Sequence, residues 1–385
     1  MREQTKEPAN PLRALGALEQ SVWLDYIRRS LLEGGELRRL IEEDGVCGVT
    51  SNPSIFEKAI AGGLEYADIL EGAGASTDAV ALYERLAVRD IRDAADLLRP
   101  VYDRSGKRDG YVSLEVSPLL AADREGTLTE ARRLWAAVDR PNLMIKVPGT
   151  GEGIAAVRQL IGEGINVNVT LLFALEAYEQ AAEAYIAGLE GLLARGGDPA
   201  AVASVASFFV SRIDASIDAD LDARLSPSTP APERRLLQSL RGKVAIANAK
   251  LAFQRYQELF RGPRWRALAA RGAQTQRLLW ASTGTKDQSY SDVLYVEELI
   301  GPDTVNTMPP ATLAAFRDHG RPRASLGEDL DGARQVMRRL GEAGISLKET
   351  TDALLAQGIR LFADAFRKLL AAVEQQRGAT EGGRR

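Results

Sequence analysis

The order of apolar segments along the chain constrains its fold more than any other feature. Short apolar or β-branched runs, typical of buried strands, alternate with longer amphipathic stretches such as residues 78–98 and 175–193. Strands that alternate with helices indicate parallel βαβ units. The strands that we predict are residues 22–25, 46–50, 112–116, 143–147, 165–171, 203–210, 278–282 and 304–308. Eight strands can close a barrel, so we predict an α/β protein with a (β/α)8 barrel, and a doubly wound open sheet is the alternative.

The chain is longer than the barrel requires, since about 250 residues suffice and the chain has 385. We predict a helical insertion between the sixth and seventh strands, about residues 214–276, with a long helical pattern over 233–260. A C-terminal helical extension begins at a capping box, Ser346 to Glu349. Its predicted apolar face is Leu355, Ile359, Phe362, Phe366, Leu370 and Val373. We therefore expect one domain over residues 1–376 and a frayed tail over 377–385.

Composition excludes several classes of function. Cys47 and His319 are each the only residue of their type, which leaves no pair for a disulfide and no Cys/His set for a zinc site. The formal charge of −4 gives no electrostatic case for nucleic acid or for a membrane surface. The N-terminal stretch is polar, and no run approaches the roughly 20 apolar residues of a membrane helix. We expect a cytoplasmic protein, and composition does not predict its oligomeric state.

A lysine interrupts the fourth predicted strand. In Leu-Met-Ile-Lys-Val-Pro, residues 143–148, alternation places Met144 and Lys146 on one face, and we expect that face to be the barrel interior. Burial of an ammonium is costly and favours the neutral amine, which can attack a ketone and form an imine. The alternative is a strand-end lysine that reaches solvent or pairs with a carboxylate.

Polar side chains on three other strands point toward the same space. Glu115 shares a face with Ser113, Asn168 shares one with Thr170, and Asp25 ends the first strand. Each of them could be a structural hydrogen-bonding group. Convergence of several strand ends is what an active site in a barrel requires, so we predict a site around Lys146.

A glycine-rich turn follows the lysine strand, but it does not match a dinucleotide-binding fingerprint. The pattern G-x-G-x-x-G starting at Gly149 would need a glycine at position 154, which is Ile154. Residues 166–170, where the acidic partner of the ribose would be, contain no acidic residue. We interpret the loop as one that leaves room for substrate.

These segments together resemble the transaldolase family, in particular its longer bacterial type, whose members form a Schiff base. The matching stretches are residues 48–56, 113–116, 142–148, 164–173, 206–214 and 280–286, which follow the family's order from about 23 to 308. The resemblance implies the reversible transfer of dihydroxyacetone from sedoheptulose 7-phosphate to glyceraldehyde 3-phosphate, as in the pentose phosphate pathway. It implies sugar-phosphate substrates and neither a metal nor an organic cofactor.

The resemblance also assigns roles to individual residues. Lys146 would be the Schiff-base lysine and Asp25 the general acid/base, while Glu115 and Thr170 would hold a catalytic water. The remaining residues would bind substrate: Asn52 and Asn168 at the imine and its hydroxyls, Ser207 and Arg212 at the sugar phosphate, and Phe209 beside the water, where it would suppress release of the three-carbon unit.

The sequence departs from the family at the end of the seventh strand. Many members have a second phosphate-binding arginine just after the strand's serine, whereas Ser282 is followed here by Thr-Gly-Thr and then Lys286. Lys286 would supply that charge as a point charge. Two alternatives stay open: a fructose-6-phosphate aldolase that releases free dihydroxyacetone, and a non-catalytic sugar-phosphate binding protein. Phe209 favours transfer over release.

Overall fold

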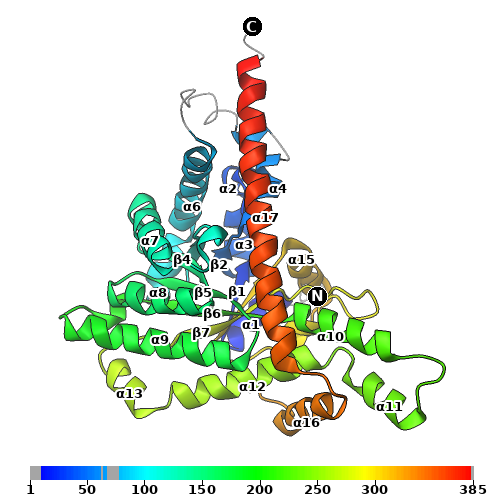
Figure 1. Ribbon diagram of the computed structural model, residues 1–385. Helices are drawn as coiled ribbons and strands as arrows, with labels where there is room; N and C mark the ends of the chain where they lie inside the picture. Colours follow the sequence, from blue (N-terminus) through cyan, green and yellow to red (C-terminus); the bar gives the residue numbers. More distant parts are fainter. Residues whose placement is uncertain (1–9, 62–63, 67–77, 383–385) are drawn as a thin grey trace, which may run out of the picture.

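The predicted strands form a closed barrel of eight parallel strands, β1 to β8, in chain order (Figure 1). A computed structural model describes residues 10–61, 64–66 and 78–382. The strands are β1 Gln20–Leu24, β2 Val46–Thr50, β3 Tyr111–Glu115, β4 Leu143–Pro148, β5 Val167–Leu172, β6 Ser204–Phe209, β7 Arg277–Ala281 and β8 Thr304–Met308. The (β/α)8 prediction is confirmed, and the pairing of β1 with β8 rules out the open sheet.

Helices follow the strands and cover the outside of the barrel (Figure 1). Those of the first half are α1 Pro11–Ala17, α2 Arg29–Glu33, α3 Glu36–Asp44, α4 Pro53–Ala61, η1 Leu64–Tyr66, α6 Ala79–Arg104, η2 Pro118–Leu120, α7 Arg124–Val138 and α8 Gly151–Gly162. Those of the second half are α9 Leu175–Ala194, η3 Pro199–Ala201, α10 Ser211–Arg224, α11 Ala231–Leu240, α12 Val244–Leu259, α13 Pro263–Ala269, α14 Leu294–Glu297, α15 Pro310–His319, α16 Leu330–Glu342 and α17 Leu347–Gly382. None of the helices in the described part of the chain is both long and apolar enough to span a membrane.

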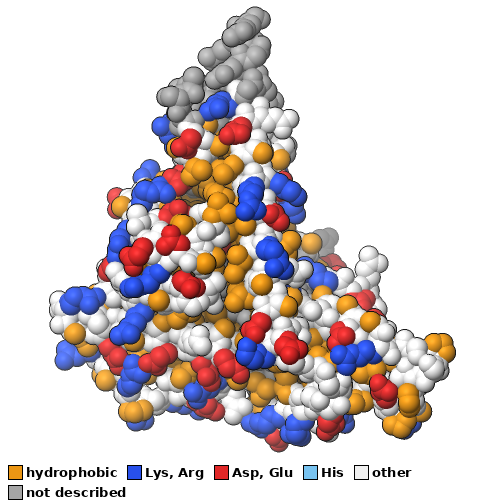
Figure 2. Space-filling view, in the orientation of Figure 1, with side chains coloured by type: hydrophobic (Ala, Val, Ile, Leu, Met, Phe, Trp, Pro, Cys, Tyr) orange, Lys and Arg blue, Asp and Glu red, His pale blue; other side chains and the backbone are white. Residues whose placement is uncertain are grey.

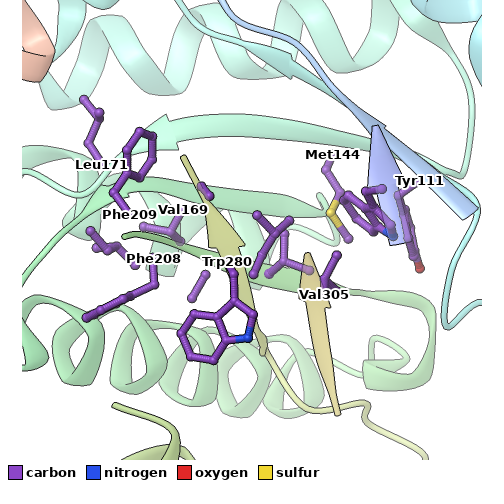
Figure 3. Close-up of a cluster of buried hydrophobic side chains, with 14 of the residues drawn as sticks. Tyr111, Met144, Val169, Leu171, Phe208, Phe209, Trp280 and Val305 are labelled. Atoms are coloured by element: carbon purple, nitrogen blue, oxygen red, sulfur yellow. The ribbon is translucent and has the colours of Figure 1, made fainter. Parts of the chain in front are cut away.

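Side chains of successive strands fill the barrel and the layer under the helices. Figure 3 shows Phe208 and Phe209 on opposite sides of β6, with Phe208 turned toward Trp280 and Phe209 toward Leu171. At the other end of the barrel the fully buried Trp23 occupies the space beside Gly48. A Cβ atom at position 48 would lie 2.3 Å from the Trp23 ring, so this strand position requires glycine.

The predicted strand ends shift by one or two residues for identifiable reasons. The fifth strand begins at Val167 and not at residue 165, because the Asn166 side chain ties the bases of the neighbouring strands together. Its Nδ2 donates to the carbonyls of Pro141 and Leu143, and its Oδ1 accepts from the Ala203 amide. Asn166 therefore lies at the base of the barrel, away from the strand ends that carry Lys146 and Glu115.

The insertion between β6 and β7 is helical, but its long helical pattern over 233–260 forms two helices. α11 ends at Leu240 and α12 begins at Val244. Between them Gly242 has φ +64°, a left-handed conformation that interrupts a helix. The helical pattern did not predict this division, because a single glycine in a helical pattern does not reveal its backbone conformation.

The C-terminal extension packs along the barrel as α17, which runs beside α4 (Figure 1). Its start agrees with the predicted cap, since the Ser346 hydroxyl accepts from the Glu349 amide at 3.2 Å. α17 continues past Gln376 to Gly382, and residues 383–385 of the expected frayed tail lie outside the described residues. Because α17 contacts α4, α6, α10 and β5, we propose that the insertion and the extension belong to the same domain as the barrel.

The surface in the orientation of Figure 2 carries acidic and basic side chains side by side, with no region of one charge. Apolar side chains gather beside α17 on this face. The large apolar residues that are most exposed in the described part of the chain are Val80, Leu119 and Leu361.

Candidate active site

A cavity of about 460 Å³ opens at the carboxyl ends of the strands. Eight of the predicted site residues line it: Asp25, Asn52, Lys146, Ser207, Phe209, Arg212, Ser282 and Lys286. The other three, Glu115, Asn168 and Thr170, are buried in β3 and β5 on either side of Lys146. A larger groove of about 880 Å³ lies between α8 and α9, and it contains no predicted site residue.

Strand register brings the central residues to one level. Glu115 pairs with Lys146 across β3 and β4, and Lys146 pairs with Asn168 across β4 and β5. The three strands are adjacent, and in a barrel residues at one level that face inward form a layer. The side chains therefore meet because their positions along neighbouring strands match.

Lys146 is 4% exposed and has two close partners. Its Nζ donates to the backbone carbonyl of Ser51 at 3.0 Å, and it lies 3.7 Å from Glu115 Oε2. Lys146 therefore does lie beside a carboxylate, as the alternative interpretation of this lysine expected. The amine nevertheless lines the cavity, where a ligand can reach it.

Glu115 is strongly affected by its surroundings. Burial raises its pKa to about 7, although the positive charge of Lys146 acts in the opposite direction. Its Oε2 makes no hydrogen bond within the described part of the chain, and neither does the buried hydroxyl of Thr170. Buried polar atoms are normally paired, so both groups retain hydrogen-bonding capacity that the protein itself does not use.

Asp25 lies just beyond β1 and is held by the Thr50 hydroxyl, which in turn contacts a second hydroxyl. Its Oδ1 accepts from Thr50 Oγ1 at 2.6 Å, and that hydroxyl lies 2.7 Å from Thr307 Oγ1. Burial raises the pKa of Asp25, while Lys146 and the Thr50 hydrogen bond lower it. A carboxyl group with a raised pKa beside an amine is suited to take up and return a proton.

A chain of hydrogen bonds fixes Asn168. Its Nδ2 donates to Ser113 Oγ at 3.0 Å, and its Oδ1 accepts from Ser207 Oγ at 2.6 Å. The amide is fully buried, and these contacts determine which way it faces. Ser113 and Thr50 were not among the predicted site residues, although Thr50 ends β2 and Ser113 shares the inward face of β3 with Glu115.

Two cations lie at the rim of the cavity. Arg212 stands in the first turn of α10, 5.5 Å above the Phe209 ring, and its buried Nη1 has no hydrogen-bond partner within the described residues. Lys286 lies at the exposed edge, and partial burial together with the charge of Arg212 lowers its pKa. A guanidinium, an ammonium and a helix N-terminus at one place suit a phosphate group.

Among the residues of the cavity, Phe362 was not predicted as part of the site, whereas Ser282 was. Phe362 from α17 lines the cavity, so the C-terminal extension contributes directly to the site. Ser282 has φ +56°, and its hydroxyl lies 3.0 Å from that of Ser211. No group of three or more His, Cys, Asp or Glu side chains that could hold a metal occurs in the described part of the chain.

The barrel and this set of side chains define an enzyme with a buried amine, flanking carboxyl groups and a cationic rim. The family model described as Transaldolase/Fructose-6-phosphate aldolase matches residues 22–373. The chain is 48% identical to a transaldolase of Trichodesmium erythraeum over 95% of its own length and 97% of the relative's. It is 48% identical to a transaldolase of Thiobacillus denitrificans, over 94% and 99% of the two chains, and 47% identical to transaldolase 1 of Streptomyces coelicolor, over 95% and 94%. The chain belongs to the transaldolase/fructose-6-phosphate aldolase family.

Proposed function

We propose that the protein is a transaldolase that transfers a dihydroxyacetone unit from sedoheptulose 7-phosphate to glyceraldehyde 3-phosphate, forming erythrose 4-phosphate and fructose 6-phosphate. The observation that carries the proposal is the buried amine of Lys146, which faces a cavity bounded by Asp25 and by the cations Arg212 and Lys286. This arrangement places a nucleophile, a proton carrier and a phosphate site around one space.

In the proposed reaction, the neutral amine of Lys146 attacks the ketose C2 carbonyl. Loss of water from the resulting carbinolamine gives the imine. Glu115 and Thr170 hold the water that relays protons in these steps, which fits their unused hydrogen-bonding capacity. The expected roles of Asn52 and Asn168 are hydrogen bonds to the intermediate.

Cleavage of the C3–C4 bond then releases the aldose. Asp25 takes the proton from the C4 hydroxyl, and the bonding electrons move into the imine, which becomes an enamine. The enamine attacks the aldehyde carbon of the acceptor, and Asp25 returns the proton to the new hydroxyl. Hydrolysis of the new imine frees Lys146 and the product.

The cationic rim supports a phosphorylated substrate. The buried Nη1 of Arg212 has no hydrogen-bond partner among the residues that the structure describes. Arg212 stands with Ser207 on the β6 side of the cavity, while Lys286 approaches from the segment after β7. In this proposal Lys286 takes the place of a second arginine and contributes a point charge. A cytoplasmic location is part of the same proposal, because its phosphorylated substrates are intracellular metabolites.

Transfer and release differ in the fate of the enamine. Phe209 is 6% exposed, lies 5.2 Å from the Phe173 ring and presents an apolar wall to the cavity. A phenyl ring supplies no proton to the enamine, which favours capture by an aldose over release of free dihydroxyacetone. The aldolase activity is therefore the second candidate.

The test is an assay with fructose 6-phosphate as donor, with and without erythrose 4-phosphate. We expect sedoheptulose 7-phosphate to form rapidly with acceptor and little dihydroxyacetone to appear without it. Dihydroxyacetone release at a comparable rate without acceptor would make the protein an aldolase. Lys146→Ala should lower kcat by more than about 10³-fold, as loss of a covalent nucleophile does. Substantial activity in this variant would contradict the imine mechanism.

A further inference from the structure

Three aspartates on α10 form a regular series along one side of that helix. This side faces two other segments of the chain: the corner between α11 and α12, and the segment after β7. Asp214, Asp218 and Asp222 are spaced by four residues, so they lie on one face, about 6 Å apart along the axis. Asp214 and Asp218 are buried, and Asp222 is exposed. We call these three residues the aspartate ladder.

Each aspartate of the ladder bonds to the corner between α11 and α12. Asp214 accepts from the Ala245 amide at 2.8 Å, and Asp218 accepts from the Gly242 amide at 3.2 Å. Asp222 pairs with the Arg241 guanidinium. The ladder therefore anchors the helical insertion at the glycine that breaks it.

Each aspartate is also connected to the segment that follows β7. Tyr295 donates its hydroxyl to Asp214 at 3.0 Å, and Tyr290 donates to Asp218 at 2.8 Å. At the third aspartate the connection runs through Arg241, whose Nη2 donates to Asp287 Oδ2 at 3.2 Å. Asp287 is the residue next to Lys286.

Gly242 permits this contact. A Cβ atom at that position would lie 2.8 Å from the Tyr290 ring, so the insertion corner and the segment after β7 approach too closely for any other residue. The left-handed φ of Gly242 and its close approach to Tyr290 are independent requirements for the same glycine.

The two cations of the rim are thus attached to one frame. Arg212 is on α10 itself, two residues before the first aspartate of the ladder, and Lys286 is on the segment that the ladder holds. We propose that Arg241 and Tyr290 are positioning residues, and that the insertion holds Lys286 at the separation from Arg212 that a phosphate group needs. This inference rests on the proposed function of the rim.

Phosphate binding by a lysine depends on the position of its backbone more than phosphate binding by an arginine does. An ammonium on a flexible stem has no fixed fork to align with phosphate oxygens, so its contribution depends on where the backbone carries it. Backbone placement of Lys286 is what the contacts of Asp287, Tyr290 and Tyr295 restrict.

The test compares the double variant Arg241→Ala/Tyr290→Phe with wild type and with Arg264→Ala. Arg264 is the matched control, because it anchors α13 of the same insertion to Glu190 at 2.8 and 2.7 Å and to Glu183 at 2.5 Å. Within the described residues it makes no hydrogen bond to the segment after β7. The first readout is the Kd of inorganic phosphate by calorimetry. The second is KM for erythrose 4-phosphate and for unphosphorylated erythrose, at saturating fructose 6-phosphate.

We expect the double variant to bind phosphate about tenfold more weakly and to show a similar rise in KM for erythrose 4-phosphate. KM for erythrose and kcat of the double variant should stay within about twofold of the wild-type values. Arg241→Lys in place of Arg241→Ala should recover part of the lost phosphate affinity, because lysine restores the positive charge. The control should keep the wild-type phosphate Kd even if its Tm falls.

An unchanged phosphate Kd in the double variant, or an equal weakening in Arg264→Ala, would overturn the inference and leave the insertion as scaffold. A KM rise of the same size for both acceptors would do so as well. If wild type bound phosphate with the predicted dependence on the ladder but transferred no dihydroxyacetone, the proposed function would fail and the inference would stand.

Discussion

At the scale of single residues, the candidate site is built from side chains whose burial conflicts with their charge. Lys146, Glu115 and Asp25 meet below a cavity at the ends of β4, β3 and β1. Burial of ionisable groups costs stability and shifts pKa values, and active sites are where proteins tolerate this cost. The pKa of Glu115, raised to about 7, is the clearest case.

The first prediction concerns the pH dependence of catalysis. As a proton relay, Glu115 must accept a proton, so kcat/KM of wild type should rise as pH increases through about 7, where the carboxyl ionises. Glu115→Gln should lower kcat by about 10²-fold, the typical size of a general acid/base contribution. The variant should also lose the step near pH 7. A step that persisted unchanged in the variant would assign the titration to another group.

Several of these residues could be predicted from strand alternation alone. Lys146, Glu115, Asn168 and Thr170 are polar positions on inward faces of otherwise apolar strands, and a barrel has only one mouth where such positions converge. Thr50 and Thr307 could not be predicted in this way. Threonine is common in strands, and these two are distinguished only by the contact of Thr50 with Asp25 and of Thr307 with Thr50.

At the scale of elements, strand positions with glycine are as restrictive as those with catalytic side chains. Gly48 lies in β2 against the Trp23 ring of β1. β1 and β2 cannot move apart, because each of them is paired with a strand on both sides within the closed barrel.

We therefore predict that Gly48→Ala destabilises the protein by about 1–3 kcal/mol, the usual cost of overpacking a core. The measurement is the midpoint of chemical unfolding. The matched control is Gly341→Ala in α16, where a Cβ atom meets nothing within 4 Å. There alanine should leave stability unchanged or raise it by up to about 1 kcal/mol, because it favours helix. Similar midpoints for the two variants would contradict the tight fit around Trp23.

Element boundaries were less predictable than element types. Every predicted strand is present, but the helical pattern over 233–260 concealed the corner at Gly242. Hydrophobic periodicity continues through the corner because both helices bury one face. What breaks the helix there is a set of contacts with Asp218 and Tyr290, which lie far away in the sequence.

At the scale of the whole molecule, the segments added to the barrel converge on its mouth. The insertion reaches the segment that carries Lys286, and α17 brings Phe362 to the cavity. The amphipathic pattern of the extension predicted that it packs on something, and Phe362, Phe366 and Val373 are indeed buried. The pattern could not predict the partner, since an apolar face fits many surfaces.

Buried carboxyl groups also make a prediction about the stability of the molecule as pH changes. Burial raises the pKa of Glu115 from its ordinary value of 4.5 to about 7, and that of Asp214 from 3.8 to about 7. Between the ordinary and the raised pKa values, from about pH 4 to about pH 7, the folded state binds more protons than the unfolded state. The free energy of unfolding therefore falls as pH rises through this range. Burial is the largest cause of the increase in both pKa values.

Glu115→Gln removes one of these titrations. We predict that the Tm of the variant relative to wild type increases from pH 5 to pH 8, because only wild type must bury a carboxylate at the higher pH. Calorimetric scans at several pH values measure this difference. A difference in Tm that did not depend on pH would show that Glu115 ionises in the folded protein as easily as in the unfolded chain.

The most direct test of the account is borohydride trapping with fructose 6-phosphate, followed by mass mapping of the modified peptide. The imine mechanism predicts that fructose 6-phosphate is cleaved while bound to Lys146 and that the remaining enamine takes up a proton to form a three-carbon imine. Borohydride reduces that imine, so a three-carbon dihydroxyacetone adduct should be found on Lys146 and be absent from Lys146→Ala. An adduct on another lysine would move the nucleophile away from the centre of the site. No adduct at a sugar concentration that demonstrably binds would contradict Schiff-base catalysis by this chain.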